Sequence, residues 1–235
     1  MKVFRKFRSH YMKENKFKKY VLYALGEIVL VVIGILIALQ VNERVEFSKN
    51  RKKERALLNE LYKESTSNLN QLQEQREGYK ASLDASTIVM RNLERIADPN
   101  SQDSILNYGP GMFRGITFDP SNGIVESLLS TGDIQHIQND TLRNYIITWK
   151  DVLKDYQEEE MNSRGFWKDV VEPYLVYNAD MTNASSLKNV ELLERPEFLN
   201  MISRRIFYLR AILYSEEATN IERTLEEMIR LSTPD

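Results

Sequence analysis

One glutamate, Glu27, interrupts an apolar segment and is the residue whose position most strongly suggests chemistry. Residues 20–41 contain fourteen Leu, Ile and Val side chains, and their only strongly polar members are Glu27 and Gln40. A carboxyl group in lipid needs a partner or a nearby interface. Three roles are therefore open: a hydrogen bond to a partner helix, which we prefer, tolerance near the cytoplasmic interface, or a proton or ion relay.

Helical spacing places small residues on the same face as this glutamate. At about 100° per residue, Glu27, Val31, Gly34, Ala38 and Val41 lie close to one line along the helix. Gly34 and Ala38 form a small-xxx-small pair, which allows a second helix to approach closely. We therefore expect Glu27, Gly34 and Ala38 to form a transmembrane association face, used in a homo-oligomer or with other membrane proteins.

The other residue types that support catalysis give weak signals. The chain has no cysteine, which excludes disulfides and thiol catalysis, and its only histidines are His10 and His136. Gly109-Pro110-Gly111 is a turn and not a phosphate loop, because no Lys-Ser/Thr pair follows it into a helix. The sequence thus predicts no catalytic, cofactor-binding or metal-binding residue, and an enzyme is the least favoured class.

Charged clusters and tryptophans are interpreted as structural. Glu158, Glu159 and Glu160 point in different directions on a helix, so a solvated face is expected there. Arg204, Arg205 and Arg210 are spaced to pair with acids of a neighbouring helix. Trp149 and Trp167 are expected to anchor the core.

An irregular segment, residues 98–123, is the candidate binding loop. It holds four of the nine glycines and three of the six prolines, and long loops in compact domains are usually functional or disordered. Phe113, Ile116 and Phe118 should fold back onto the helices, followed by a short helix over 124–129 that is capped by 119–121. The binding residues would be Tyr108, Phe113, Arg114 and Phe118, although a purely structural connection is the favoured alternative.

The apolar segment has the length of a membrane span. Twenty-two helical residues, 20–41, cover about 33 Å, enough for the hydrocarbon core. Fourteen Leu, Ile and Val contribute roughly −4 to −8 kcal/mol to insertion, which exceeds the cost of about 3 kcal/mol for one acid. Signal peptides have shorter apolar regions and a small-residue cleavage site, which residues 38–40 do not match well. An uncleaved anchor is predicted.

Flanking charge predicts its orientation. Residues 1–19 hold eight Lys or Arg against one Glu, whereas residues 42–55 hold six against three acids. The positive-inside rule then places the N-terminus in the cytoplasm. Three regions are therefore expected. Residues 1–19 form a basic tail, which is either an interfacial helix on lipid or a disordered topology signal. A membrane span follows at 20–41, and an extracytoplasmic domain at 42–235.

The extracytoplasmic part is predicted to be an all-α helical bundle. Residues 50–97 carry apolar side chains at nine of twelve positions in two heptad series, 58 to 93 and 62 to 97, which favours one long helix at a bundle or coiled-coil seam. Two further long helices are expected at about 140–172 and 196–231. Their apolar stripes are Leu142, Ile146, Trp149, Leu153, Tyr156, Trp167, Val170 and Tyr174, and Phe207, Ala211, Tyr214, Ala218, Ile221, Leu225 and Met228.

Three stretches of the chain resemble a known family. They are residues 26–42 (GEIVLVVIGILIALQVN), the segment from Glu14 to Tyr20, and the stretch from Ser130 to Tyr145. This sequence is similar to a family of single-span membrane proteins of unknown function that is common in Bacteroidota. It departs from the family at Asn42-Glu43-Arg44, where such sequences often read Asn-x-Trp-Asn-Glu. The resemblance implies an anchor and a topology, but no activity.

The function that these patterns favour is a membrane-anchored helical interaction or scaffold protein that self-associates through its span. The alternative is an accessory subunit of an ion-driven or transport complex that uses Glu27 as an intramembrane carboxylate. A sensor is disfavoured, because 19 cytoplasmic residues cannot hold an output domain. The net charge of −2 argues against nucleic-acid binding. The expected location is a bacterial inner membrane, in contact with lipid and with the C-terminal domain in the periplasm.

Overall fold

The computed structural model describes residues 3–96, 98–113, 117–183 and 186–234, and all regular elements in these ranges are helices. The chain divides into two compact units, Met1–Lys53 and Glu54–Asp235. The longest helix, α1 (Val3–Leu93), contributes to both. The predicted all-helical fold is confirmed for the described residues.

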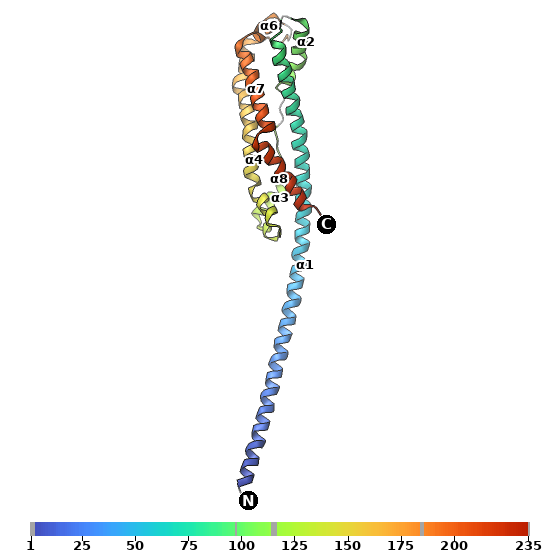
Figure 1. Ribbon diagram of the computed structural model, residues 1–235, viewed down its shortest axis with the longest axis vertical. Coiled ribbons are helices and arrows are strands. Elements are labelled where there is room, and N and C mark those ends of the chain that lie inside the picture. Colours follow the sequence, from blue (N-terminus) through green and yellow to red (C-terminus); the bar gives the residue numbers. More distant parts are fainter. Residues whose placement is uncertain (1–2, 97, 114–116, 184–185, 235) are drawn as a thin grey trace. The chain divides into compact units, whose positions relative to one another are not determined.

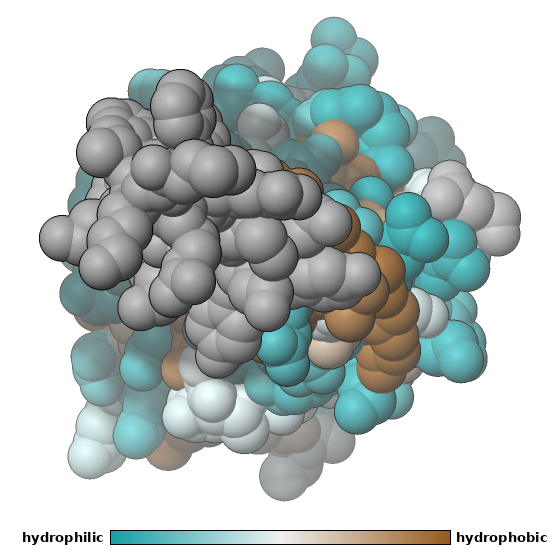
Figure 2. All heavy atoms as spheres, turned by 90° about the horizontal axis from the view of Figure 1, so that it is seen from below, coloured by the Kyte–Doolittle hydropathy of each residue, from teal (hydrophilic) through white to brown (hydrophobic). Residues whose placement is uncertain are grey.

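The first unit is helical and exposes its apolar side chains. Large hydrophobic residues between Val21 and Val41 are 40–75 % exposed, and none of the span's most apolar 18-residue window is buried. Brown, hydrophobic side chains are visible on the surface in Figure 2. This segment has the length and composition of a helix that could cross a membrane.

The second unit is built around three long, roughly parallel helical segments. They are the part of α1 from Glu54 onward, α4 (Asp140–Phe166), and the pair α7 (Pro196–Tyr214) and α8 (Glu216–Ser232), which lie side by side in Figure 1. Short helices close the two ends: α3 (Gly123–Ser130) at one, and α2 (Pro99–Tyr108) and α6 (Leu187–Leu193) at the other. The remaining elements are η1 (Gly109–Gly111), η2 (Asp133–His136), the π-helix η3 (Trp167–Val171) and α5 (Glu172–Asn178).

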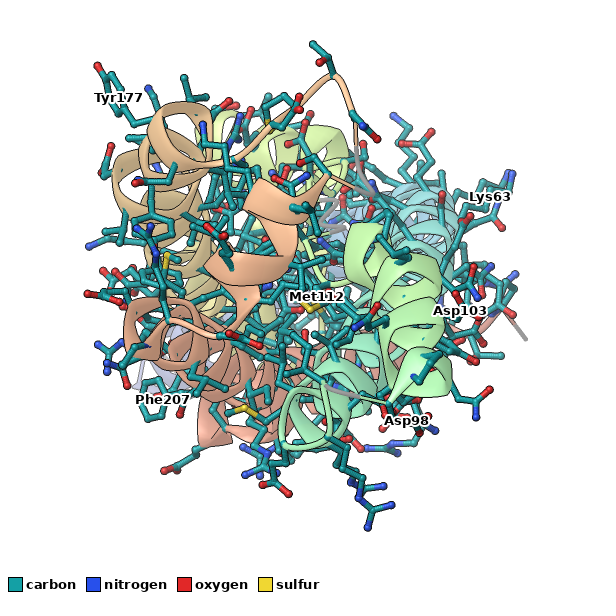
Figure 3. All side chains as sticks on the ribbon, turned by 90° about the horizontal axis from the view of Figure 1, so that it is seen from above. Lys63, Asp98, Asp103, Met112, Tyr177 and Phe207 are labelled. Carbon is teal, nitrogen blue, oxygen red and sulfur yellow. The ribbon has the colours of Figure 1, made fainter. Side chains whose placement is uncertain are left out.

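Two hydrophobic clusters hold the bundle together. The larger one joins α1, α3, α4, α7 and α8, with Leu61, Leu72 and Tyr156 completely or almost completely buried. The smaller one joins α1, α2 and α7 around Val89, Met112 and Ile202. Met112 lies at the centre of the bundle in the end-on view, whereas Tyr177 and Phe207 point outward (Figure 3).

The buried face of α1 differs from the predicted one. The series that includes Ser65, Leu72, Tyr79, Ser86 and Leu93 is buried, as the heptad pattern indicates. The second series predicted, 62 to 97, is only partly buried: Leu83 belongs to the core, and Leu69 and Met90 pack against it. The second fully buried series is Leu61, Asn68, Gln75, Ser82 and Val89. Three of these five residues are polar, so a search for apolar repeats does not find them.

Two local changes of helix geometry explain the other deviations. The predicted helix 196–231 is interrupted at Ser215, whose extended backbone and side chain cap α8 by accepting from the Ala218 amide. Beyond that break Ala218, Ile221, Leu225 and Met228 are buried as predicted, but Phe207 and Tyr214 before it are exposed, and that part of the predicted stripe is wrong. The turns on either side of Ser215 therefore present different faces.

The π-helix η3 also changes which side chains are buried, near residue 170. A π-turn contains one more residue than an α-turn, so it rotates the following side chains. Val171 is completely buried and Val170 is exposed, the reverse of the predicted stripe. Pro173 follows directly and has no N–H to donate to residue 169, which accounts for the widened turn.

The segment 98–123 is less irregular than predicted. It contains α2 and η1, and Asp98 caps α2 by accepting from the Asn100 amide. The helix predicted at 124–129 is confirmed as α3, but residues 119–121 are not its cap. The carboxylate of Glu64 on α1 instead accepts from the Ile124 amide, at 3.1 Å, and from the Ser121 hydroxyl, at 2.9 Å.

Candidate functional site

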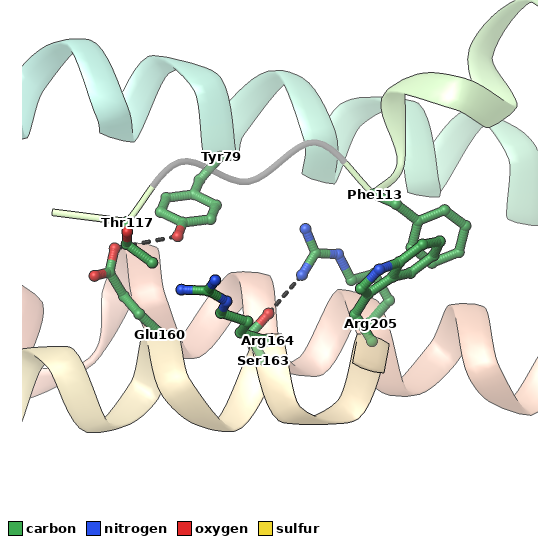
Figure 4. Close-up of a pocket in the computed structure, with 8 residues that line it drawn as sticks. Tyr79, Phe113, Thr117, Glu160, Ser163, Arg164 and Arg205 are labelled. Atoms are coloured by element: carbon green, nitrogen blue, oxygen red, sulfur yellow. Dashed lines mark hydrogen bonds between the residues drawn. The ribbon is translucent and has the colours of Figure 1, made fainter. Parts of the chain in front are cut away.

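A cavity of about 420 Å³ lies between α1, α4 and α7. Charged and hydroxyl-bearing side chains and an aromatic pair share its wall (Figure 4). Thr117 and Arg164 are exposed, so the cavity is open to solvent on their side. Its lining residues are Tyr79, Phe113, Thr117, Glu160, Ser163, Arg164, Trp167 and Arg205.

Glu160 forms one end of this cavity and is only 2 % exposed. Its carboxylate accepts from the Gln75 amide at 2.6 Å, the Tyr79 hydroxyl at 3.1 Å and the Phe118 backbone N–H at 3.0 Å. Burial raises the pKa of Glu160 to about 7, and these three donors, which favour the ionised form, limit the rise. The group therefore changes its charge close to neutral pH.

Arg205 is a buried cation, 4 % exposed, at the middle of the cavity. Its Nε donates to the Met112 carbonyl at 3.0 Å, and its two Nη groups donate to the hydroxyls of Ser163 and Ser82. Ser82 itself donates to the Met112 carbonyl. Burial lowers the pKa of the guanidinium, but Arg is expected to stay charged because its ordinary pKa is so high. Arg205 thus joins α1, α4 and α7 and brings a positive charge into the bundle.

An aromatic pair closes the opposite end. The rings of Phe113 and Trp167 have centroids 4.4 Å apart at an interplanar angle of 43°. Trp167 is the first residue of η3, so the widened turn beside Pro173 sets the direction of its side chain. In Figure 4 the guanidinium groups of Arg164 and Arg205 lie between Phe113 at one end and Tyr79 and Glu160 at the other.

A second hollow, of about 320 Å³, lies at the end of the bundle that carries α2 and α6. Its wall is mostly aliphatic and includes Val89, Ile105, Leu192 and Phe198, with Asp180 and Asn189 as polar members. Asn189 is occupied in holding the 180–189 loop, since its amide donates to the Asp180 carbonyl and its carbonyl accepts from the Asp180 amide. The polar groups of this hollow therefore serve the loop itself.

Only one of the four residues predicted to form the binding loop lines the central cavity. Phe113 lines the central cavity, whereas Phe118 is buried against Tyr156, with ring centroids 6.0 Å apart, and serves the core. Tyr108 is exposed at the end of α2, and Arg114 lies outside the described residues. Of the four residues predicted to bind, Phe113 therefore lines the cavity and Phe118 supplies its backbone N–H, and Thr117 of the same segment also lines the cavity.

The predicted transmembrane residues lie in the first unit, and no other described residue covers them. Glu27, Gly34 and Ala38 are exposed on α1, and a side chain at Gly34 would meet no atom within 4 Å. Their face is open in the single chain. Whether it packs on a partner helix stays a prediction.

Sequence reasoning missed the two buried charged residues of the cavity. Glu160 was assigned to a solvated face, which is wrong, because it is buried while Glu158 is exposed. The spacing of Arg205 predicts a pair with an acid, but its guanidinium donates to two hydroxyls and a carbonyl. The signal that could have found Glu160 is its spacing, four residues after Tyr156 on the buried stripe of α4. Among the described residues, no group of three or more His, Cys, Asp or Glu is placed to hold a metal ion.

A family model described as "Family of unknown function (DUF6090)" matches residues 27–209. The chain belongs to this family. The DUF6090 region begins at Glu27 within the apolar part of α1 and includes every residue that lines the central cavity, while α8 lies beyond it. Comparisons with curated proteins and with solved structures find no match.

Proposed function

We propose that this DUF6090 protein is a single-span membrane protein that presents a helical interaction domain outside the cytoplasm and associates through its span. The observation that carries the proposal is the exposure of the large Leu, Ile and Val side chains between Val21 and Val41. About 25 cal/mol for each Å² of apolar surface favours removing them from water, and no described residue of the first unit buries them. A lipid bilayer would cover all of them.

The open face of the span supports association between helices. Glu27 and Gly34 lie about two turns apart on α1, and the space beside Gly34 is free for a second backbone. A carboxyl group in lipid gains from a hydrogen-bonding partner on another helix. A second copy of this chain would supply the same group at the same depth.

The hydrogen bonds of the bundle support a structural role for its two buried charges. Glu160 and Arg205, the buried charged residues of the cavity, are each bonded to at least two other segments of the chain. Groups held in this way fix the helices relative to one another.

Extraction and topology measurements test the proposal. The full-length protein should stay in the membrane pellet after washing at alkaline pH, which removes peripheral proteins. A periplasmic reporter fused after Asp235 should be active, because the positively charged N-terminal segment holds the N-terminus in the cytoplasm. The same fusion with residues 20–41 deleted is the control and should lose both properties. Release by alkaline washing, or a reporter active only in the cytoplasm, would refute the proposal.

A further inference from the structure

The charges around the central cavity do not balance. Two guanidinium groups, those of Arg164 and Arg205, face one carboxyl group, that of Glu160. Glu160 directs its oxygens to donors from α1 and from Phe118, and no ion pair joins it to either arginine in the described part of the chain. The wall is therefore net positive when Glu160 is ionised and more so when it is protonated.

Arg164 is the group best placed to meet a ligand. It lines the cavity from α4, is exposed, and makes no hydrogen bond or ion pair with any residue in the described ranges. Arg205 lies on the other side of the Ser163 hydroxyl in Figure 4 and is fixed by its own hydrogen bonds. One exposed and one buried guanidinium together offer donors suited to a carboxylate, sulfonate or phosphate group.

The rest of the wall suits the body of an organic molecule. A volume of about 420 Å³ is within the roughly 300–1,000 Å³ typical of small-molecule sites and far exceeds what one inorganic ion fills. Phe113 and Trp167 supply an apolar wall beside the arginines, and Thr117 adds a hydroxyl on the open side. An apolar or aromatic part of a ligand would be covered by these rings.

We infer that the central cavity is a binding site for a small organic anion, with the negative group between Arg164 and Arg205 and the apolar body against Phe113 and Trp167. This inference goes beyond the proposed function and does not depend on the membrane anchor, since every residue that carries it belongs to the second unit.

Protonation of Glu160 adds a pH dependence to the site. Its pKa of about 7 means that the cavity becomes more positive as the pH falls from 8 to 6, so an anion binds more tightly at pH 6. The neighbouring buried groups keep their charge across this range, because burial raises the pKa of both tyrosines above their ordinary value and the ordinary pKa of the Arg205 guanidinium is very high. The buried neighbours are Tyr79 on α1, Tyr156 on α4 and Arg205 on α7, and the exposed one is Arg164 on α4.

The test uses the full-length protein in nanodiscs of neutral lipid and measures binding by titration calorimetry. The probe is benzenesulfonate, which has a ring and a single negative charge at every pH used. Sulfate lacks the ring, and benzenesulfonamide keeps the ring but is neutral. We expect benzenesulfonate to bind more tightly than either of them.

Substitutions test whether benzenesulfonate binds in the central cavity. Arg164→Gln should weaken benzenesulfonate binding about tenfold, the effect of one charge-assisted hydrogen bond. The matched control is Arg210→Gln, which removes an exposed arginine of α7 that does not line the cavity and should leave the dissociation constant unchanged. Glu160→Gln should bind at pH 8 as tightly as the unmodified protein does at pH 6, and its affinity should not change between these values.

Three results would overturn the inference. They are the absence of benzenesulfonate binding, equal binding of the neutral sulfonamide, and equal weakening by Arg164→Gln and Arg210→Gln. Arg164 is exposed and unpaired within the described ranges, so its replacement should not unfold the protein, and circular dichroism of each variant verifies this.

Discussion

The carboxyl group of Glu160 is buried beside three hydrogen-bond donors, and its ionisation is therefore coupled to folding. Its pKa is about 7 in the folded protein and 4.5 ordinarily. Between these values the unfolded chain loses the proton and the folded chain keeps it, so the free energy of unfolding falls as the pH rises. Stability from this group is fully present below pH 4.5 and is lost by the time the pH has risen through 7.

This linkage predicts a difference between the unmodified protein and Glu160→Gln. The stability of the unmodified protein should decline by about 3 kcal/mol relative to the variant as the pH is raised from 4.5 to 8, at about 1.4 kcal/mol for each unit of pKa. Urea unfolding followed by circular dichroism at several pH values measures it. Parallel pH profiles for the two proteins would show that Glu160 does not titrate in this range.

The surroundings of two buried tyrosines predict different changes in stability when the hydroxyl group is removed. Tyr79 donates to Glu160 at 3.1 Å, whereas the hydroxyl of Tyr156 has no hydrogen-bond partner among the described residues. At pH 8, Tyr79→Phe should cost about 1–3 kcal/mol, because it removes a hydrogen bond to a charged group. Tyr156→Phe should be neutral or stabilising by up to about 1 kcal/mol. Chemical denaturation of both variants decides, and an equal loss of stability would contradict the assignment.

At the scale of elements, one side chain bridges the break between α7 and α8. Arg76 of α1 donates to the Leu213 carbonyl at 3.0 Å, to the Ala218 carbonyl at 3.2 Å and to the Glu222 carboxylate at 3.1 Å. The carbonyl of Leu213 belongs to the last turn of α7, where acceptors lack helical partners. Arg76 thus holds the two helices at the angle that Ser215 allows.

Arg76→Met should therefore destabilise the protein by about 1–3 kcal/mol, since methionine keeps much of the aliphatic stem but donates no hydrogen bond. The control is Arg230→Met. Arg230 is exposed and pairs with Glu227 one turn away, and water screens such a surface ion pair. Thermal unfolding of the two variants gives the comparison, and a difference within experimental error would rule out the bridging role of Arg76.

Element types were largely predictable from the sequence, but their buried faces were predictable only in part. Apolar spacing indicates the long helices because burial repeats with the helical period. The π-turn at Trp167 and the break at Ser215 each rotate the chain, so one stripe cannot be continued through them. The cavity was not predictable for a related reason: Glu160 and Arg205 occupy seam positions at which residue type alone indicates a surface.

At the scale of the whole molecule, substitutions of Glu27 distinguish between a helix association face and a proton or ion relay. If it bonds a partner helix, Glu27→Gln should be nearly silent, because the amide retains a donor and an acceptor. Glu27→Leu should then weaken association by about 1 kcal/mol, and Gly34→Leu by more, since it blocks close approach. Cross-linking of the spans in membranes measures this. An assembled but inactive Glu27→Gln protein would instead favour the accessory subunit of an ion-driven complex.

The helix α8 completes the larger hydrophobic cluster and follows α1 and α4 in the chain. Its side chains Ala218, Ile221 and Leu225 are completely buried, in the cluster that includes Leu142 and Tyr156 of α4. A ribosome therefore produces α1 and α4 before α8, and the part of the α4 stripe that α8 covers stays exposed until α8 has emerged. A chain cut short near Ser215 would expose that part of the stripe to chaperones and proteases.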